Sequence, residues 1–453
     1  MIGRGSSFQF RGAEKAAARV ATALKATHVL DGSVRRSGTV VRIGAHLIEC
    51  EHEIVLWSGR FERDLSDVFA LQDEIAGAVA GALETTFAGG APAGVIDPVA
   101  YDLYLRAPFP PSRTSDVTIG MERLEKATRL APNFASAWAA LAYYRAVYIR
   151  QPVREGKADI ERRHVIDAAQ TALRLDPTAG FAYAALGELE PWGAYGAREA
   201  LLERSVTSMP RNPEILALMG GFLLTVGRNE EALRYASQAL ELNPLSDAAT
   251  GVLGMALAFA GRYEECQQSY ETARRMWPLD EEFWTAPIFN AAFHEDWRRF
   301  DELSAAATGA GMASTFMSTA LAAGEMLRHP TSRRRERILG VIDDQLEASG
   351  TIPYGLLIQA HRMGLADETF LFVKRASFAH LFDGTGPRPA ADYTPAIIFD
   401  RTANTPMMRD IRFVGFCAKI GLCDYWVKTG RWPDCVAQVP YDFKAAARAL
   451  AMA

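Results

Sequence analysis

The chain has 453 residues, a length that predicts more than one domain, and its 49% hydrophobic and 23% charged residues are typical of a soluble protein. Its net charge of −5 argues against a nucleic-acid-binding surface, which is usually basic. No apolar stretch reaches the roughly 18 residues that a membrane span needs, and no signal-peptide pattern begins the chain. With five cysteines and no such signal, we expect reduced thiols in a cytoplasmic protein.

Residues 1–87 predict a small α/β domain. Its expected elements are a helix over 14–25, strands over 27–36, 39–49 and 54–63, and a helix over 66–84. Ser37 and Gly38 form a hairpin-turn signal, and Ser66 is a suitable N-cap. In the second strand Val41, Ile43, Ala45 and Leu47 alternate with mostly polar residues, which predicts one buried face. Residues 88–97, rich in glycine and alanine, predict a linker.

The domain also carries a family resemblance, in the residues from His28 to Arg36 and in the runs 41–43, 56–57, 60–65 and 69–75. Together these resemble the TolB-like amino-terminal domain of bacterial proteins. That domain often precedes helical repeats and, in many such proteins, follows a class III adenylate cyclase or a winged-helix DNA-binding domain. In the family, the segment like Ile2–Phe8 is an interior strand, so either the domain is truncated at its N-terminus or the start codon is misassigned. No segment resembles a cyclase catalytic domain or a recognition helix, so the resemblance implies neither activity here.

Four prolines then recur at steps of 33, 34 and 34 residues: Pro177, Pro210, Pro244 and Pro278. Such a period indicates stacked helix pairs. In residues 213–244 a small residue, Gly220, allows two helices to approach, Gly227 ends the first helix, and Ala232 and Ala239 lie where the helices cross. Residues 247–278 repeat the pattern, which resembles the tetratricopeptide repeat family. We therefore expect a mostly α fold, a tetratricopeptide-type α-solenoid over 98–310 preceded by the small α/β domain.

The units on either side of these two are more divergent. The unit 135–177 needs extra residues around 149–159, the unit 180–210 is broken by Pro191, and the helix pair after Pro278 lacks the glycine and alanine marks. Residues 311–400 predict divergent helical repeats and a loop, and residues 401–453 a C-terminal helical cap. We expect three aromatic residues of this cap to cover the open end of the solenoid: Tyr425, Trp426 and Trp432.

No candidate catalytic, metal or cofactor site outweighs its simpler interpretation. Residues 49–53 combine glutamates, a cysteine and a histidine, but they fall at a predicted strand turn. Cys417, Cys423 and Cys435 lack zinc-site spacing and favour buried thiols. The arginines of 333–337 are interrupted by an acid and favour a solvated helix face. Residues 384–386 precede prolines rather than a helix, so they are not a phosphate loop. We expect no enzyme activity, no cofactor and no metal.

The tetratricopeptide resemblance implies that positions 2, 5, 9 and 12 of each first helix line a concave surface. The resulting candidate partner-binding residues are Tyr143, Phe181, Glu188, Leu224 and Met255. Our first hypothesis is a non-catalytic module that binds a protein or peptide there, in bacterial signalling or regulation. The alternative is the regulatory half of a class III adenylate cyclase or of a transcriptional regulator. A periplasmic role is a third alternative, and the sequence leaves the oligomeric state open.

Overall fold

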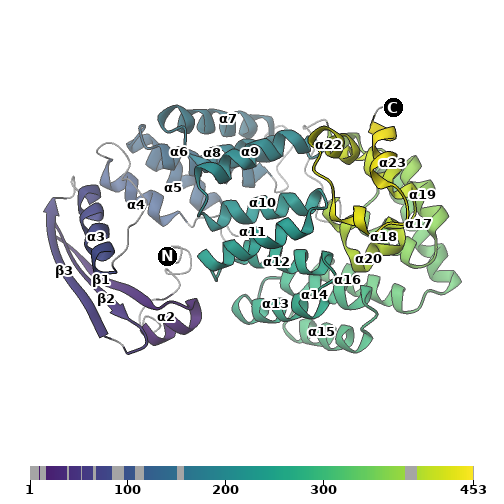
Figure 1. The fold of residues 1–453 in the computed structure, drawn as a ribbon, viewed down its shortest axis with the longest axis horizontal. Coiled ribbons are helices and arrows are strands. Elements are labelled where there is room, and N and C mark those ends of the chain that lie inside the picture. Colours follow the sequence, from purple (N-terminus) through teal and green to yellow (C-terminus); the bar gives the residue numbers. More distant parts are fainter. Residues whose placement is uncertain are drawn as a thin grey trace.

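The computed structural model describes residue 10 and residues 17–37, 40–52, 54–64, 68–83, 96–107, 117–149, 158–382 and 395–451. The chain is mostly helical, with a small sheet at one end, a stack of helix pairs in the middle and a second helical group at the other end (Figure 1). The predicted fold class, a mostly α solenoid preceded by a small α/β unit, is confirmed. Among the described residues, no helix is both long and apolar enough to cross a membrane.

The N-terminal sheet has the strand order β1-β2-β3 and is antiparallel throughout. Its elements are α2 (Ala17–Leu24), β1 (His28–Ser37), β2 (Val40–Glu49), β3 (Ile54–Asp64) and α3 (Val68–Ala82). The alternation expected in β2 is present: Val41, Ala45 and Leu47 are buried, whereas Arg42 and His46 are exposed. α2 contacts β1 and α3 contacts β3. Gly38, Ser66 and the segment 2–8 lie outside the described residues.

Eight helix pairs follow. Their bounds are α4 (Pro98–Arg106) and α5 (Val117–Leu130), α6 (Ala135–Ile149) and α7 (Ala158–Leu175), α8 (Gly180–Leu189) and α9 (Tyr195–Ser208), α10 (Pro213–Thr225) and α11 (Asn229–Leu242), α12 (Asp247–Phe259) and α13 (Tyr263–Met276), α14 (Glu282–Phe293) and α15 (Trp297–Gly309), α16 (Thr315–Arg328) and α17 (Ser332–Ser349), and α18 (Tyr354–Arg362) and α19 (Ala366–Arg375). The inserted residues expected near 149–159 lie between α6 and α7, mostly outside the described residues.

The residues marked in the sequence pattern lie where the helices approach each other. Ala232, Ala239 and Ala273 are fully buried. A Cβ on Gly220 would come within 2.9 Å of the Val252 side chain, so this position needs the smallest residue. Some of the helices begin with a side-chain cap, as at Asn212, whose oxygen accepts hydrogen bonds from the backbone N–H groups of residues 214 and 215.

The first helix of three successive pairs ends in a left-handed residue, at spacings of 34. Gly227 and Gly261 have φ values of +78° and +75°. The third residue is Glu295, with φ +58°, although the sequence suggested that the glycine mark was lost there. The residue after each one donates the backbone hydrogen bond that closes a Schellman turn, as from Asp296 N–H to Ala291 O (2.9 Å). The turn geometry is therefore retained where the glycine is not.

The last group comprises η3 (Ala379–Leu381), η5 (Pro395–Phe399), α20 (Arg401–Met408), α21 (Arg412–Lys419), α22 (Leu422–Thr429), η6 (Asp434–Ala437) and α23 (Phe443–Ala451). α21 has one apolar face: Phe413, Phe416 and Cys417 are buried, as is Ile420 directly after the helix. These elements pack against α18 and α19. We call residues 354–382 and 395–451, from α18 to α23, the C-terminal layer.

Candidate functional site

The five predicted partner-binding residues do not form one exposed cluster. Tyr143 in α6 and Phe181 in α8 pack together, with ring centroids 5.5 Å apart, and are only 6% and 8% exposed. Glu188 and Met255 are half-buried. Leu224 is 1% exposed because the end of α10 packs against η5. A partner would therefore reach Leu224 only if the C-terminal layer moved away.

Trp426 and Tyr425 bond Val226 and Glu199 within the array and do not cover its open end, which corrects the expectation for these two aromatic residues. Trp426 donates from Nε1 to the backbone oxygen of Val226 (3.0 Å), in the turn between α10 and α11. Asp434 caps the same turn: its N–H donates to Gly227 O (2.9 Å), and its carboxylate accepts from Glu230 N–H (2.9 Å). The layer thus lies beside the turn between α10 and α11 (Figure 1). Trp432 is only partly buried.

A buried polar network joins the layer to α9 and α11. The carboxylate of Glu199 accepts hydrogen bonds from Tyr425 Oη (2.9 Å), Arg228 Nη1 (2.5 Å) and Arg431 Nη1 (2.5 Å). Arg228 also forms a paired contact with Glu231 (2.7 Å for both bonds). Burial raises the pKa of Tyr425, so its hydroxyl stays protonated and can donate. A buried carboxylate with three donors is well satisfied, and removing one donor leaves it partly unpaired. Sequence reasoning missed this network because its members lie about 200 residues apart.

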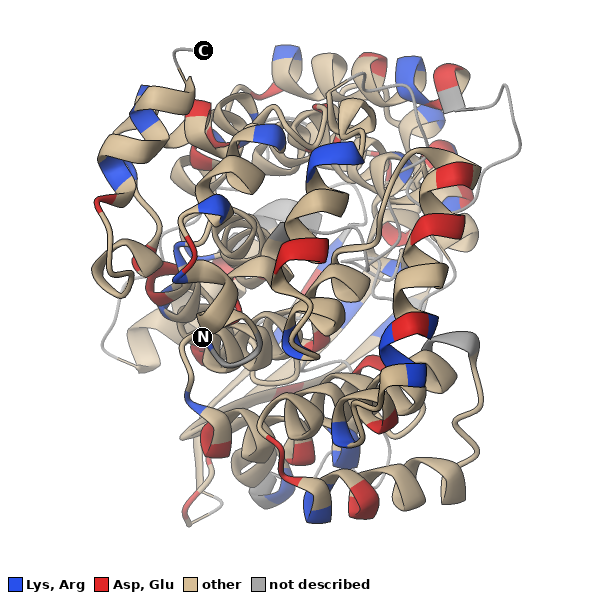
Figure 2. Cartoon of the chain, turned by 90° about the vertical axis from the view of Figure 1, so that its right-hand side faces the viewer, with Lys and Arg blue, Asp and Glu red and all other residues tan. Residues whose placement is uncertain are grey.

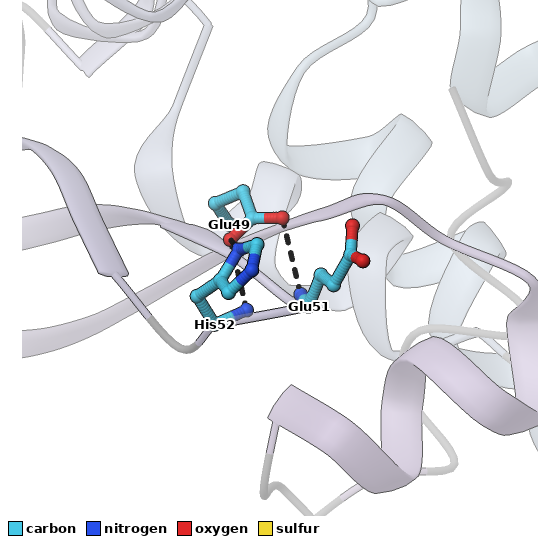
Figure 3. A group of neighbouring side chains, drawn as sticks. All are labelled: Glu49, Glu51 and His52. Carbon is cyan, nitrogen blue, oxygen red and sulfur yellow. Dashed lines mark hydrogen bonds and ion pairs between the residues drawn. The ribbon is translucent and has the colours of Figure 1, made fainter.

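The acidic turn after β2 is the one group of possible metal ligands that lie close together within the described residues (Figure 3). Glu49 accepts from the backbone N–H of Glu51 (3.2 Å) and of His52 (3.0 Å), and it faces His52 Nδ1 (3.3 Å). The backbone hydrogen bond from His52 is the largest cause of the lowered pKa of Glu49. The Glu49 carboxylate is therefore occupied in stabilising the turn, and Glu51 and His52 are exposed.

The five cysteines are all buried, and none of them forms a disulfide bond. Burial raises the pKa of Cys423 and Cys435 to about 12 and that of Cys417 well above its usual value. Thiols in this state are protonated at neutral pH and are poor nucleophiles.

The basic run at the start of α17 lies on the surface. Thr331, Arg333, Arg334, Glu336 and Arg337 line a shallow hollow there. Arg334 donates to the backbone oxygens of Glu325 (2.5 Å) and His329 (3.2 Å), at the end of α16. On this side of the molecule basic and acidic positions are interspersed (Figure 2). The expectation of a solvated, charged helix face is consistent with this arrangement.

Comparison with known proteins gives one sequence relative. No family model matches the chain. A protein of Rhizobium meliloti (strain 1021) named "Putative adenylate cyclase 3" is 37% identical over 112 residues, and this match covers 24% of the chain. The match spans 19% of that protein, so the chain corresponds to about a fifth of its relative.

Several solved structures align with parts of the chain. Pseudomonas aeruginosa pilF is 18% identical over 49% of this chain and 97% of its own, with a TM-score of 0.35. Yeast Tom70 is 13% identical over 72% of this chain and 67% of its own, with a TM-score of 0.35. YrrB, described as a TPR protein with an unusual peptide-binding site, is 19% identical over 44% of this chain and 98% of its own, with a TM-score of 0.32. These similarities concern the fold alone.

Proposed function

We propose that the chain is a non-catalytic interaction module that binds a protein or peptide on the concave surface of its helix pairs. The supporting observation is the succession of first helices: α6 contacts α8, α8 contacts α10, and α10 contacts α12. Their side chains therefore form one continuous wall, which is the kind of surface that repeat proteins use for binding. The five cysteines are buried and form no disulfide bond, which favours a reducing compartment, and we assign the module to the bacterial cytoplasm.

Of the five predicted contact residues, Glu188 and Met255 are half-buried and lie within reach of a partner. Tyr143, Phe181 and Leu224 instead hold the wall in shape. Small residues lie between them: Gly221 is half-buried, and Ala248 is exposed. An apolar or amphipathic helical segment suits such a wall, because small residues let its backbone approach closely. With a net charge of −5, we include no nucleic-acid partner.

The test compares partner capture by wild type, Met255→Asp and a control, Leu279→Asp. Leu279 is 81% exposed in a loop between helix pairs, so its substitution adds the same charge without touching the wall. We expect Met255→Asp to lose partners that the other two proteins retain, with circular dichroism spectra unchanged. If all three proteins capture the same partners, the concave wall is not the binding surface. Tyr143→Asp is unsuitable here, because it would bury a charge and destabilise the stack.

A second function is favoured by one observation, the 37% identity over 112 residues with the Rhizobium meliloti protein. We propose as the alternative that this chain is the regulatory part of a class III adenylate cyclase. The N-terminal sheet would then be the TolB-like domain of such a protein. Translating the genomic frame upstream of Met1 tests this alternative. A cyclase domain encoded in that frame supports it, and an unrelated gene or a stop codon close to Met1 rejects it.

A further inference from the structure

The C-terminal layer forms hydrogen bonds with four successive turns of the helix-pair array, and corresponding positions in these turns lie 34 residues apart: Gly193, Gly227, Gly261 and Glu295. At the first turn, Gly193 N–H donates to Leu381 O (2.7 Å). Next to it, Tyr195 Oη donates to Ile420 O (3.0 Å). At the second turn, Trp426 and Asp434 bond the backbone of residues 226 and 227.

The third and fourth turns are each held by an arginine. Arg401 in α20 donates from Nη1 to Ala260 O (3.1 Å). Arg362 in α18 donates from Nη2 to Phe293 O (2.8 Å) and also faces the carboxylate of Glu295 (3.3 Å). Both arginines thus satisfy carbonyl groups at the end of a first helix, which have no partner within that helix.

These hydrogen bonds affect how the helix pairs of the array open by local unfolding. In a plain repeat array each unit contacts its neighbours, so units can open one after another. The C-terminal layer is one packed body, since α18 contacts α20 and η5 while α21 contacts α19, α22 and α23. One core cluster also includes residues of both the repeats and the layer, among them Leu224, Phe399 and Trp426. Opening any one turn therefore strains the contacts of the same body with the other three.

We propose that the C-terminal layer is a strap that makes the four pairs from α8 to α15 open as a single cooperative unit and fixes the curvature of their concave wall. The strongest attachment is at the second turn, where the Glu199 network and Trp426 act together. At the third and fourth turns the attachment rests on a single arginine, so these two turns provide the means of testing the coupling. The inference does not depend on what the wall binds.

The test is hydrogen exchange, measured by mass spectrometry on the full chain, for wild type, Arg401→Met and a control, Arg298→Met. Methionine keeps most of the aliphatic stem and removes the donor. Arg298 is 75% exposed and pairs with Glu302 of its own helix, so its loss should leave exchange unchanged. The reporting amides are those of Arg228, Arg262 and Asp296, which close the turns.

For Arg401→Met we expect exchange to rise by a similar factor, roughly fivefold, at all of these turns, because a cooperative unit loses stability as a whole. Exchange in α6 and α7, which none of these hydrogen bonds reaches, should stay at the wild-type rate. A rise confined to residues 257–262 would overturn the strap, because the turns would then open independently. An equal rise that included α6 and α7 would also overturn it, because the cooperative unit would be the whole chain.

A second variant, Arg362→Met, removes the attachment at the fourth turn and should give the same pattern. A rise in exchange confined to residues 291–296 would overturn the coupling of that turn to the other three. Thermal melts of all four proteins show whether each variant is folded under the exchange conditions.

Discussion

Two equivalent glycines differ only in what lies beside them, and this difference predicts two different stability losses. Gly227 and Gly261 both have left-handed backbones, with φ values of +78° and +75°. Alanine in such a conformation costs about 1–2 kcal/mol, and this cost should be common to Gly227→Ala and Gly261→Ala. A Cβ at position 261 meets no atom within 4 Å, so the backbone strain is the whole effect there.

At position 227 the added Cβ would lie 2.8 Å from Pro433 Cβ and 2.9 Å from Phe399 Cδ1. Both neighbours belong to the C-terminal layer, and Phe399 is 2% exposed, so neither can move freely. Overpacking of this kind adds about 1–3 kcal/mol. The total loss expected for Gly227→Ala is therefore about 2–5 kcal/mol, against about 1–2 kcal/mol for Gly261→Ala.

Urea denaturation followed by circular dichroism measures both losses, provided that the slope m is the same for wild type and variants. Gly261→Ala serves as the matched control, because any change in the unfolded chain is the same for both substitutions. Equal losses at the two positions would refute the reasoning, since they would mean that the layer does not press on the α10–α11 turn.

Four further predictions concern other parts of the chain. Glu295→Gly should stabilise the chain by about 0.5–1 kcal/mol in urea denaturation, because glycine adopts φ +58° without strain; a loss would show that the Arg362 pair outweighs this gain. Gly220→Leu should cost about 1–3 kcal/mol in the same assay, because it wedges α10 against Val252, and an unchanged midpoint would contradict the packing. Burial lowers the pKa of His361, so the unfolded chain binds more protons near pH 6; stability should fall as the pH drops below about 6.5, and less so in His361→Gln, as thermal melts would show. The five thiols should react with a maleimide only on unfolding, and rapid labelling of the native chain would refute their burial.

The sequence was most informative where a contact joins residues close along the chain. The helix pairs between Pro213 and Pro278 follow from residues within 34 positions of one another, and the structure retains the small residues and left-handed glycines at those positions. The antiparallel hairpins of the N-terminal sheet are equally local: the alternation in β2 was enough to identify its buried face. In both cases the period of apolar residues within a segment predicts which of its faces packs against the next segment.

Glu295 shows the limit of that approach even within the repeats. The glycine of the repeat pattern is absent at this position, but the flanking helices and the Schellman hydrogen bonds hold the backbone in the same left-handed form. A tertiary framework can impose a conformation that the local residue disfavours, provided that the rest of the turn compensates for a cost of about 1–2 kcal/mol.

The C-terminal layer could not be located from the sequence, because the residues with which it contacts the repeats are not regularly spaced along the chain. Trp426 meets Val226, Tyr425 meets Glu199, and Asp434 meets Glu230, pairs that are about 200 residues apart. The sequence of an amphipathic helix such as α21 indicates that one of its faces is buried. It does not indicate which other segment covers that face. A solenoid end and a row of turn carbonyls both offer suitable surfaces, and the sequence alone did not show that Trp426 and Tyr425 would lie beside the turns.

This placement changes how the array should be compared with simpler repeat proteins. Where repeats contact only their neighbours, the curvature of the concave wall can vary, because each interface bends independently. Here one body spans four turns and also buries Leu224, a residue that the repeat pattern assigns to the wall. The layer therefore both fixes the wall's curvature and covers part of its length. Any partner must fit the wall in this fixed curvature, which makes binding more selective and reduces the ordering cost at the moment of contact.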